Sequence, residues 1–304
     1  MYYKKAFAFS ITLWIIASLL FATVVILRFA KDAVGLSRGL NSKLQTQMMA
    51  ESVFESLKFY IPTADYTMTS LKNTFLDGTK YPLPHEIIVD GREYNITKEI
   101  TVSLKDTSGM LNIMYSPSKM LSYSLVSPNN EELRSILTDS LDDWTDEDDL
   151  KKINGAEQNN YVSLGKKRVV RNLRSIQDIH ELKLIKGFEQ VALSKIKSNL
   201  YYGRSSSLNL MLIDNKDYLS TLLGIDTRRV SNLLELRKDT PKKYINNIMG
   251  LENYNDDYMG FILSKQFIVK IKVQKEKAET RLNAIISFKK SRDRPYLTIS
   301  YSLY

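Results

Sequence analysis

The chain has 304 residues, a formal net charge of +9 and 43% hydrophobic residues, enough for one large domain or two small ones with a folded core. It contains no cysteine, which excludes disulfides and thiol catalysis. Its two histidines, His85 and His180, lie far apart without a second His or Cys nearby, and no glycine-rich phosphate loop occurs, so the usual signals of an enzyme are missing.

An uncharged apolar run, Phe7 to Leu27, follows Lys4 and Lys5 near the N-terminus. At 1.5 Å per residue, a helix of this length spans the roughly 30 Å hydrocarbon core of a bilayer. The preceding lysines favour a cytoplasmic N-terminus. A secretory signal peptide would have a shorter apolar run and a small-residue cleavage site, and the sequence LRFAKDAVG that ends and follows the run is a poor site.

The short leader before the apolar run, KKA followed by FAFSITLW, resembles the junction of pilin-like precursors. In those proteins the cut falls before the apolar segment, which stays in the membrane as a helix. The resemblance implies leader cleavage between Ala6 and Phe7.

The apolar pattern continues beyond the membrane segment as an amphipathic helix that Pro62 ends. We therefore expect one helix over 7–61, apolar all round in its first half and one-faced in its second half. The positions that carry the helical period are Leu36, Leu40, Leu44, Met48, Val53, Leu57 and Ile61.

Strand patterns flank a long helical pattern. Asp90 and Gly91 predict a two-residue hairpin turn within 87–96, and 100–104 alternates as a half-buried strand. From about Pro117 to Leu263 short one-faced helices are expected, among them ELRSILTDSLDDW, IQDIHELKLIKG and QVALSKIKSNLYYG. Alternating runs after Phe267 then predict an antiparallel three-stranded meander. The simplest topology is a helical domain inserted into an α+β host.

The middle of the chain resembles the type II secretion minor pseudopilin K family. The segments SLDDWTDEDD, NGAEQNNY and NLRSIQDIHELKLIKGFE carry the resemblance in order, and SGMLNIMY and SLNLMLIDNKDYLSTLLGI extend it on either side. The residues that match the family pattern are Asp143, Trp144, Asp146, Asp148, Gly155, Ala156, Glu157, Tyr161, Asn172, Leu173, Ser175, Glu181 and Leu182.

The resemblance implies a pilin-like α+β fold, a long N-terminal helix packed on an antiparallel sheet, with a large inserted all-α domain. Its boundaries would be a leader over 1–6, the helix over 7–61, sheet regions over 62–114 and 264–304, and the inserted domain over 115–263. It also implies a non-catalytic subunit with its bulk in the periplasm, which a prepilin peptidase processes and which joins other minor pseudopilins at the filament tip to initiate or cap it for protein export.

Two features of the N-terminus bear on the resemblance. The residue before the expected cut is Ala6 where the family usually has glycine. At the fifth mature position, where major pilins carry a glutamate, the chain has Ile11, a feature the K family shares. A carboxylate without a partner in hydrocarbon costs several kcal/mol, so its absence suits a subunit with no neighbour above it.

An acidic cluster surrounds Trp144, with six carboxylates in the eight positions from 142 to 149. Three interpretations stay open: a solvated helix face, pairing with cations of the following segment, or a calcium site, which the family resemblance also implies. In the third, Trp144 is a buried anchor. The cation partners would be Lys166, Lys167, Arg168 and Arg171, and the candidate calcium ligands are Asp143, Asp146, Asp148 and Glu157.

Two alternative functions remain beside the K-family interpretation. The stretch LSTLLGIDTRRVSNLLELRK resembles half of a helix-hairpin-helix, in which Arg228, Arg229 and Arg237 would meet DNA phosphates, although Asp226 would repel them. This alternative is a membrane-anchored DNA-binding protein of DNA uptake, whereas the K-family interpretation expects no specific nucleic-acid binding. The other alternative is a minor pilin of a type IV pilus.

Overall fold

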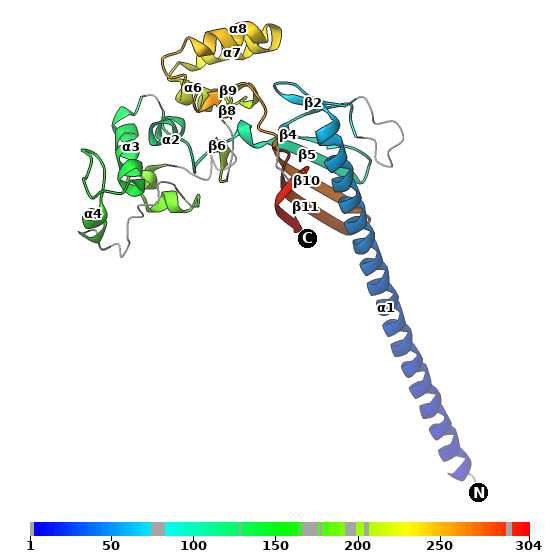
Figure 1. Cartoon of the computed structure of the whole chain (residues 1–304). Coiled ribbons are helices and arrows are strands. Elements are labelled where there is room, and N and C mark those ends of the chain that lie inside the picture. Colours follow the sequence, from blue (N-terminus) through cyan, green and yellow to red (C-terminus); the bar gives the residue numbers. More distant parts are fainter. Residues whose placement is uncertain are drawn as a thin grey trace.

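The computed structural model describes residues 3–73, 83–127, 129–163, 165, 176, 178–191, 199–203, 207–289 and 294–304. A long helix leads into an antiparallel sheet, and a lobe of short helices lies beside that sheet (Figure 1). The α-helices are α1 (Tyr3–Thr63), α2 (Ser118–Leu125), α3 (Glu131–Thr145), α4 (Gln158–Ser163), α6 (Lys216–Leu223), α7 (Thr227–Asp239) and α8 (Pro241–Met249). The longer strands are β4 (Asp90–Asn95), β5 (Ile100–Asp106), β10 (Gln266–Lys275), β11 (Ala278–Ser287) and β12 (Leu297–Leu303).

Helix α1 extends well beyond the rest of the molecule and ends one residue after Pro62, close to the predicted boundary (Figure 1). Among the described residues it is the one helix that is long and apolar enough to cross a membrane, and its most apolar window makes no buried contact with the rest of the chain. The helix therefore fits a single-pass membrane anchor.

The predicted apolar stripe of α1 divides into two parts. Val53, Leu57 and Ile61 are buried against the sheet, whereas Leu44 and Met48 are 54% and 61% exposed. The reason is the five-residue step from Met48 to Val53, which rotates the helix surface by about 140° at 100° per residue. The exposed part of the stripe, which we call the outer stripe, consists of Leu36, Leu40, Leu44 and Met48.

The sheet has five antiparallel strands in the order β12-β11-β10-β5-β4. Strand β5 and the three-stranded meander were predicted, and the pairing of β5 with β10 joins them into one sheet. Where α1 first contacts the sheet, the hydroxyls of Thr46 and Thr280 form a hydrogen bond of 2.8 Å, and Lys43 Nζ donates to the Glu279 carbonyl. The upper half of α1 and one face of the sheet form one apolar core, so the pilin-like part of the fold is built from both ends of the chain.

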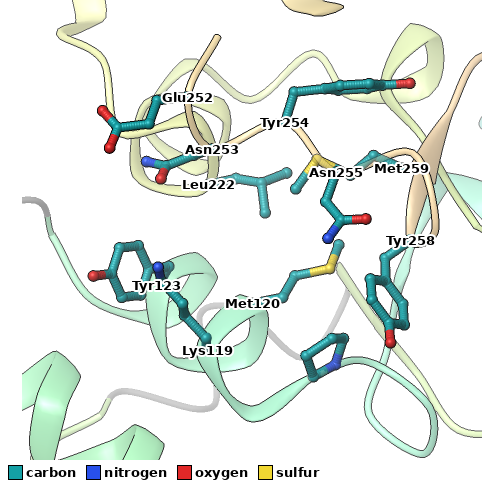
Figure 2. A pocket seen from close by; sticks show the side chains of 11 residues that line it. Lys119, Met120, Tyr123, Leu222, Glu252, Asn253, Tyr254, Asn255, Tyr258 and Met259 are labelled. Carbon is teal, nitrogen blue, oxygen red and sulfur yellow. The ribbon is translucent and has the colours of Figure 1, made fainter.

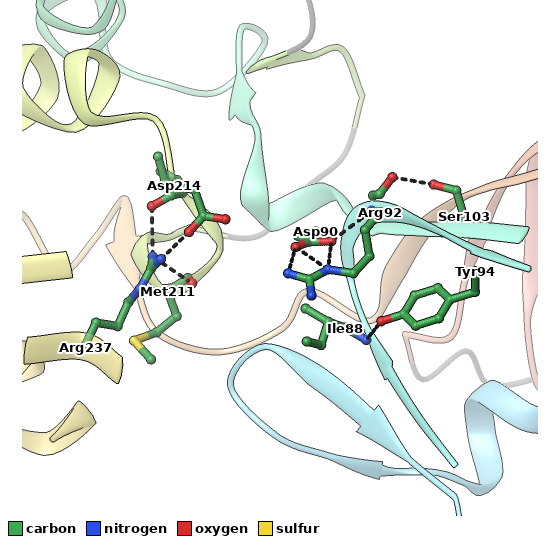
Figure 3. A network of polar contacts seen from close by, with 10 residues as sticks. Ile88, Asp90, Arg92, Tyr94, Ser103, Met211, Asp214 and Arg237 are labelled. Atoms are coloured by element: carbon green, nitrogen blue, oxygen red, sulfur yellow. Dashed lines mark hydrogen bonds and ion pairs between the residues drawn. The ribbon is translucent and has the colours of Figure 1, made fainter. Parts of the chain in front are cut away.

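The predicted hairpin at Asp90 and Gly91 is wrong. Strand β3 (Glu86–Ile88) pairs with β2 (Ser70–Lys72), which also pairs with β1 (Asp65–Tyr66), whereas β4 pairs with β5. Gly91 has the positive φ of 97° that an Asp-Gly pair favours, but it lies in an irregular stretch of the β4–β5 pairing. The Asp90 carboxylate holds this stretch by accepting hydrogen bonds from the backbone and guanidinium of Arg92 (Figure 3).

The region predicted as helical forms a lobe with its own apolar core. In its described residues the segment IQDIHELKLIKG forms not an α-helix but the 3₁₀ turn η2 (Glu181–Leu184), and a second turn, η3 (Phe188–Gln190), begins after Gly187, whose φ is 89°. Half of QVALSKIKSNLYYG, residues 192–198, lies outside the described residues. The described residues also contain the 3₁₀ turns η1 (Thr107–Gly109) and η5 (Leu210–Leu212). Two short parallel pairs join β6 (Leu111–Asn112) to β7 (Leu200–Tyr201) and β8 (Leu208–Asn209) to β9 (Met259–Gly260).

The chain crosses between the sheet and the lobe twice, and one buried carboxylate binds the backbone of both connecting segments. The chain leaves the sheet after Asp106 and returns at Gln266, and Asp106 is fully buried. Its oxygens accept hydrogen bonds from the backbone nitrogen of Ser108 at 2.8 Å and from that of Ser264 at 3.0 and 3.1 Å. Because both passages bind the same side chain, the lobe leaves the sheet at a fixed place.

Candidate cation site of the helical lobe

Helix α3 carries the acidic residues of interest at its C-terminal end. The helix begins after Asn130, whose side chain accepts a hydrogen bond from the Leu133 backbone nitrogen. Leu137, Leu141 and Trp144 are buried on the face that packs into the lobe. Asp143, directly before Trp144, is also fully buried, although it is charged.

Trp144 is the buried anchor that the sequence predicted. Its side chain is 0% exposed, and its ring packs edge-on against Tyr161 with 5.4 Å between centroids. Its indole nitrogen donates to Glu181 Oε1 at 2.8 Å. Glu181 was part of the matched sequence pattern, but its role as the tryptophan's partner, 37 residues away, was not predicted.

Three carboxylates converge beside this anchor. Asp143, Asp146 and Glu157 each offer an oxygen within 4.8 Å of the others. Asp143 is 0% exposed and Glu157 is 5% exposed. Glu157 Oε1 and Asp146 Oδ1 are buried without a hydrogen-bond partner. Buried carboxylate oxygens without donors are costly, so this arrangement needs a proton or a cation between the three groups.

The loop over 152–157 brings Glu157 to the end of α3 through a series of hydrogen bonds. Asp139 accepts from the backbone and side-chain nitrogens of Asn154 at 3.0 and 3.1 Å, and Asp143 accepts from the Lys152 backbone nitrogen at 3.2 Å. On the other side of the loop, Lys186 Nζ donates to the carbonyls of Asn154 and Gly155. The carboxylates of α3 thus hold the loop and leave Asp146 and Glu157 facing each other.

Gly155 is required by the closeness of this packing. A Cβ at this position would overlap the Asp143 carboxylate and would lie 3.0 Å from the Asp139 carbonyl oxygen. This contact gives a physical reason for the glycine within the matched Gly-Ala-Glu triplet.

Burial and the neighbouring negative charges raise the pKa values of the three carboxyl groups. Burial, together with the nearby charges of Asp143 and Asp146, raises the pKa of Glu157 from 4.5 to about 7. Burial also raises the pKa of Asp143 and of Asp146, and in Asp146 the neighbouring Asp148 adds to the effect. A divalent cation between the three oxygens would offset this repulsion.

The fourth predicted ligand, Asp148, lies outside this group of three. Asp148 is exposed and accepts a hydrogen bond from the Leu150 backbone nitrogen, and Asp142 forms an ion pair with Lys152 at 2.5 Å. Lys166, Lys167, Arg168 and Arg171, the alternative cation partners, lie outside the described residues. Ala6 and Phe7 fall within α1.

The three arginines that would contact DNA phosphates in the DNA-binding alternative differ from one another in exposure. Arg228 and Arg229 are exposed at the start of α7, where Asp226 caps the helix by accepting from the Arg229 nitrogen. Arg237 is not available to phosphate, because it donates to the carbonyls of Met211 and Ile213 and pairs with Asp214 (Figure 3). The prediction that Arg237 meets phosphate is therefore wrong.

A cavity of about 200 Å³ lies between α2, α6 and the chain over 252–259. Three tyrosines, Tyr123, Tyr254 and Tyr258, line this cavity. Lys119 and Glu252 also line it, at different places (Figure 2). Its lining combines no nucleophile with a histidine base, so it lacks the arrangement that an acyl-transfer site needs.

The fold and the site define a class of protein: a pilin-like helix and sheet, with a helix that fits a membrane anchor and an inserted helical lobe with a carboxylate cluster. The family model "Type II secretion system (T2SS), protein K" matches residues 123–200, which contain α3, the cluster and Trp144. This match confirms the predicted resemblance to the type II secretion minor pseudopilin K family, over about a quarter of the chain.

Two further comparisons concern curated protein sequences and solved structures. No curated protein sequence matches the chain. Among solved structures, the chain is similar to one chain of the crystal structure of the GspK-GspI-GspJ complex from the type 2 secretion system of enterotoxigenic Escherichia coli, with a TM-score of 0.46 and 14% identity over 90% of this chain and 99% of that one.

The packing around Gly155 predicts a selective effect of adding one methyl group. Gly155→Ala should lower the free energy of unfolding by about 1–3 kcal/mol, because the Asp143 carboxylate must move. Gly250→Ala is the matched control, since its Cβ would find its nearest neighbour at 3.6 Å, and it should change stability by less than about 0.5 kcal/mol. Urea unfolding of both variants measures the difference, and equal effects would contradict the close packing at Gly155.

The raised pKa of Glu157 predicts how metal-free protein responds to pH. Between pH 4.5 and 7 the folded state keeps a proton that the unfolded state has released, so stability is full below this window and falls as pH rises through it. Unfolding in chelator-treated buffer at intervals from pH 4.5 to 8 measures the slope. Glu157→Gln should flatten it, and a stability that rises over this range with the same slope in the variant would contradict the assignment.

Proposed function

We propose that the chain is a minor pseudopilin of the K type that assembles with other minor pseudopilins at the tip of a type II secretion pseudopilus. The observation that carries the proposal is a lobe matching the protein K family model on a pilin-like helix and sheet. In this proposal α1 anchors the chain in the inner membrane, and the sheet and the lobe lie in the periplasm.

The outer stripe of α1 provides the surface for assembly. Leu36, Leu40, Leu44 and Met48 are between 54% and 67% exposed, although their four-residue spacing is that of a packed helix. Exposed apolar side chains on one side of a helix are typical of an interaction surface. We therefore assign the outer stripe to the helices of neighbouring pseudopilins.

The N-terminus supports the place at the tip. With cleavage by a prepilin peptidase between Ala6 and Phe7, Ile11 becomes the fifth residue of the mature chain. No carboxylate is then available to neutralise the terminal amine of a neighbour in the membrane, which suits the last subunit of the filament. The mature N-terminus at Phe7 is the first measurable consequence of this proposal, by mass spectrometry of the protein extracted from membranes.

The carboxylate cluster fits a structural calcium ion. Asp143, Asp146 and Glu157 supply oxygen donors only, without Cys or His, which favours calcium or magnesium over zinc or copper. Calcium accepts irregular geometry and carbonyl or water ligands, and it would supply positive charge where two buried oxygens lack a donor. Asp148 remains a candidate for an outer position. The ion would hold the loop over 152–157 to the end of α3 and so stabilise the lobe.

A fragment over residues 32–304 is suited to solution tests. Every residue of the two apolar cores lies at or after Ala50, so removing the membrane segment leaves both cores complete.

Calcium should stabilise this fragment. The folded state alone gathers the three carboxylates, so binding raises stability by about 2.7 kcal/mol at a hundredfold excess over Kd. Thermal unfolding in EGTA and in millimolar calcium measures the effect. Asp146→Ala should abolish the difference, and the exposed Asp257→Ala should keep it. Equal midpoints in wild-type protein under both conditions would remove calcium from the proposal.

Assembly through the outer stripe should be sensitive to one charge. In the full-length chain, Leu44→Glu places a carboxylate in the stripe and should reduce co-purification of the other minor pseudopilins from solubilised membranes by at least tenfold. Leu150→Glu, at a side chain that is 78% exposed in the lobe, is the matched control and should leave co-purification unchanged. If Leu44→Glu retains its partners fully, the outer stripe is not the assembly surface.

A further inference from the structure

The two edges of the five-stranded sheet differ in how they are protected. Strand β4 at one edge has the sequence DGREYN, with three charged side chains. Strand β12 at the other edge has the sequence LTISYSL, with no charge, no proline and no glycine. Natural proteins protect exposed edges with charges, prolines or bulges. Each edge strand has one irregularity in its pairing with the neighbouring strand, so the two edges differ in their charged residues and not in this respect.

Strand β12 combines an open edge with exposed apolar side chains. Leu297, Ile299 and Tyr301 are 49%, 47% and 47% exposed. Among the described residues, β12 pairs with β11 on one side and with no strand on the other. An uncharged, β-branched and aromatic segment of this length is a hazard for aggregation when it stays open, so β12 has the composition of a strand that another chain covers.

The edge lies on the same side of the molecule as the outer stripe. The Tyr301 ring contacts the Phe54 ring of α1, with 5.8 Å between centroids. At 100° per residue, Phe54 lies in line with Leu36 around the helix and about 40°, 80° and 120° from Leu40, Leu44 and Met48. A subunit whose helix packs along the outer stripe would therefore have its globular part next to β12.

The direction of β12 argues against pairing with an identical copy. Leu303 pairs with Leu282 near the turn that contacts Lys43, and Leu297 pairs with Ser287 farther from the membrane segment. Strand β12 thus runs toward the membrane end of the sheet, opposite to α1. Two copies joined antiparallel through β12 would be related by a two-fold axis and would point their α1 anchors in opposite directions.

We propose that β12 is a docking edge that binds an extended, uncharged strand from the globular domain of a different, membrane-anchored neighbouring subunit, which adds a sixth strand to the sheet. Backbone hydrogen bonds would give affinity, and the apolar side chains of β12 would select the partner strand. The inference rests on the proposed function, because the partner is the neighbour that packs on the outer stripe.

Hydrogen exchange with mass spectrometry tests the docking edge. The probes are the purified soluble domains of the other minor pseudopilins of the same secretion system, added to the full-length chain in detergent. A partner should slow amide exchange over 297–303 and leave exchange over 90–95 unchanged. Ile299→Lys should weaken its binding at least tenfold, whereas Ile262→Lys, at a side chain that is 70% exposed elsewhere, should not. Leu297→Lys replaces the first variant if thermal unfolding shows that Ile299→Lys misfolds.

Three results would overturn the inference. If a partner binds and protects 36–48 but not 297–303, the docking edge is wrong and the proposed function stands. If protection of 297–303 rises with the concentration of this chain alone, the occupant is a second copy. If no soluble domain binds, the docking edge and the assembly role fail together.

Discussion

The convergence of three carboxylates at the end of α3, two of them buried, is the constraint on which the helical lobe depends. Asp143 and Glu157 are almost fully buried, and two oxygens of the cluster have no donor. Such a site is stable only with positive charge or protons between the carboxylates. The concentration of acids in a chain of net charge +9 is therefore only in part a solvated surface: Glu147, Asp148 and Asp149 are exposed, whereas Asp143 and Asp146 lie against Glu157.

The rest of the lobe is arranged around this cluster. Trp144 on the same helix turn is fully buried and binds Glu181, and Gly155 allows the loop to approach Asp143. The sheet is separated from this arrangement and connects to it through Asp106, which binds both passages of the chain. A change in the cluster is thus expected to act on the lobe first, while α1 and the sheet keep the core that holds them together.

Much of the fold could be predicted from local pattern, and the failures have physical reasons. The long helix and the strands of the meander have strong periods, and the structure contains them. The prediction of a hairpin turn at Asp90 and Gly91 failed because a glycine with positive φ occurs in irregular strand pairing as well as in hairpin turns. Arg237 could not be assigned from sequence, since its carbonyl partners meet it only through tertiary packing.

The candidate site was predicted in composition and only partly in geometry. Asp143, Asp146 and Glu157 come together, but no sequence spacing separates them from Asp148, which stays exposed. The partner of Trp144 lies 37 residues away, beyond the reach of any local pattern. The outer stripe of α1 shows the same limit, because helical period marks apolar positions but not whether the chain itself covers them.

A crystal structure of residues 32–304 grown in calcium, with anomalous diffraction, tests the central claim most directly. The account predicts one anomalous peak between the carboxylates of Asp143, Asp146 and Glu157, absent in crystals of Glu157→Gln. Electron density that shows these oxygens within hydrogen-bond distance of one another, or of a lysine or arginine side chain, with no anomalous peak, would contradict it.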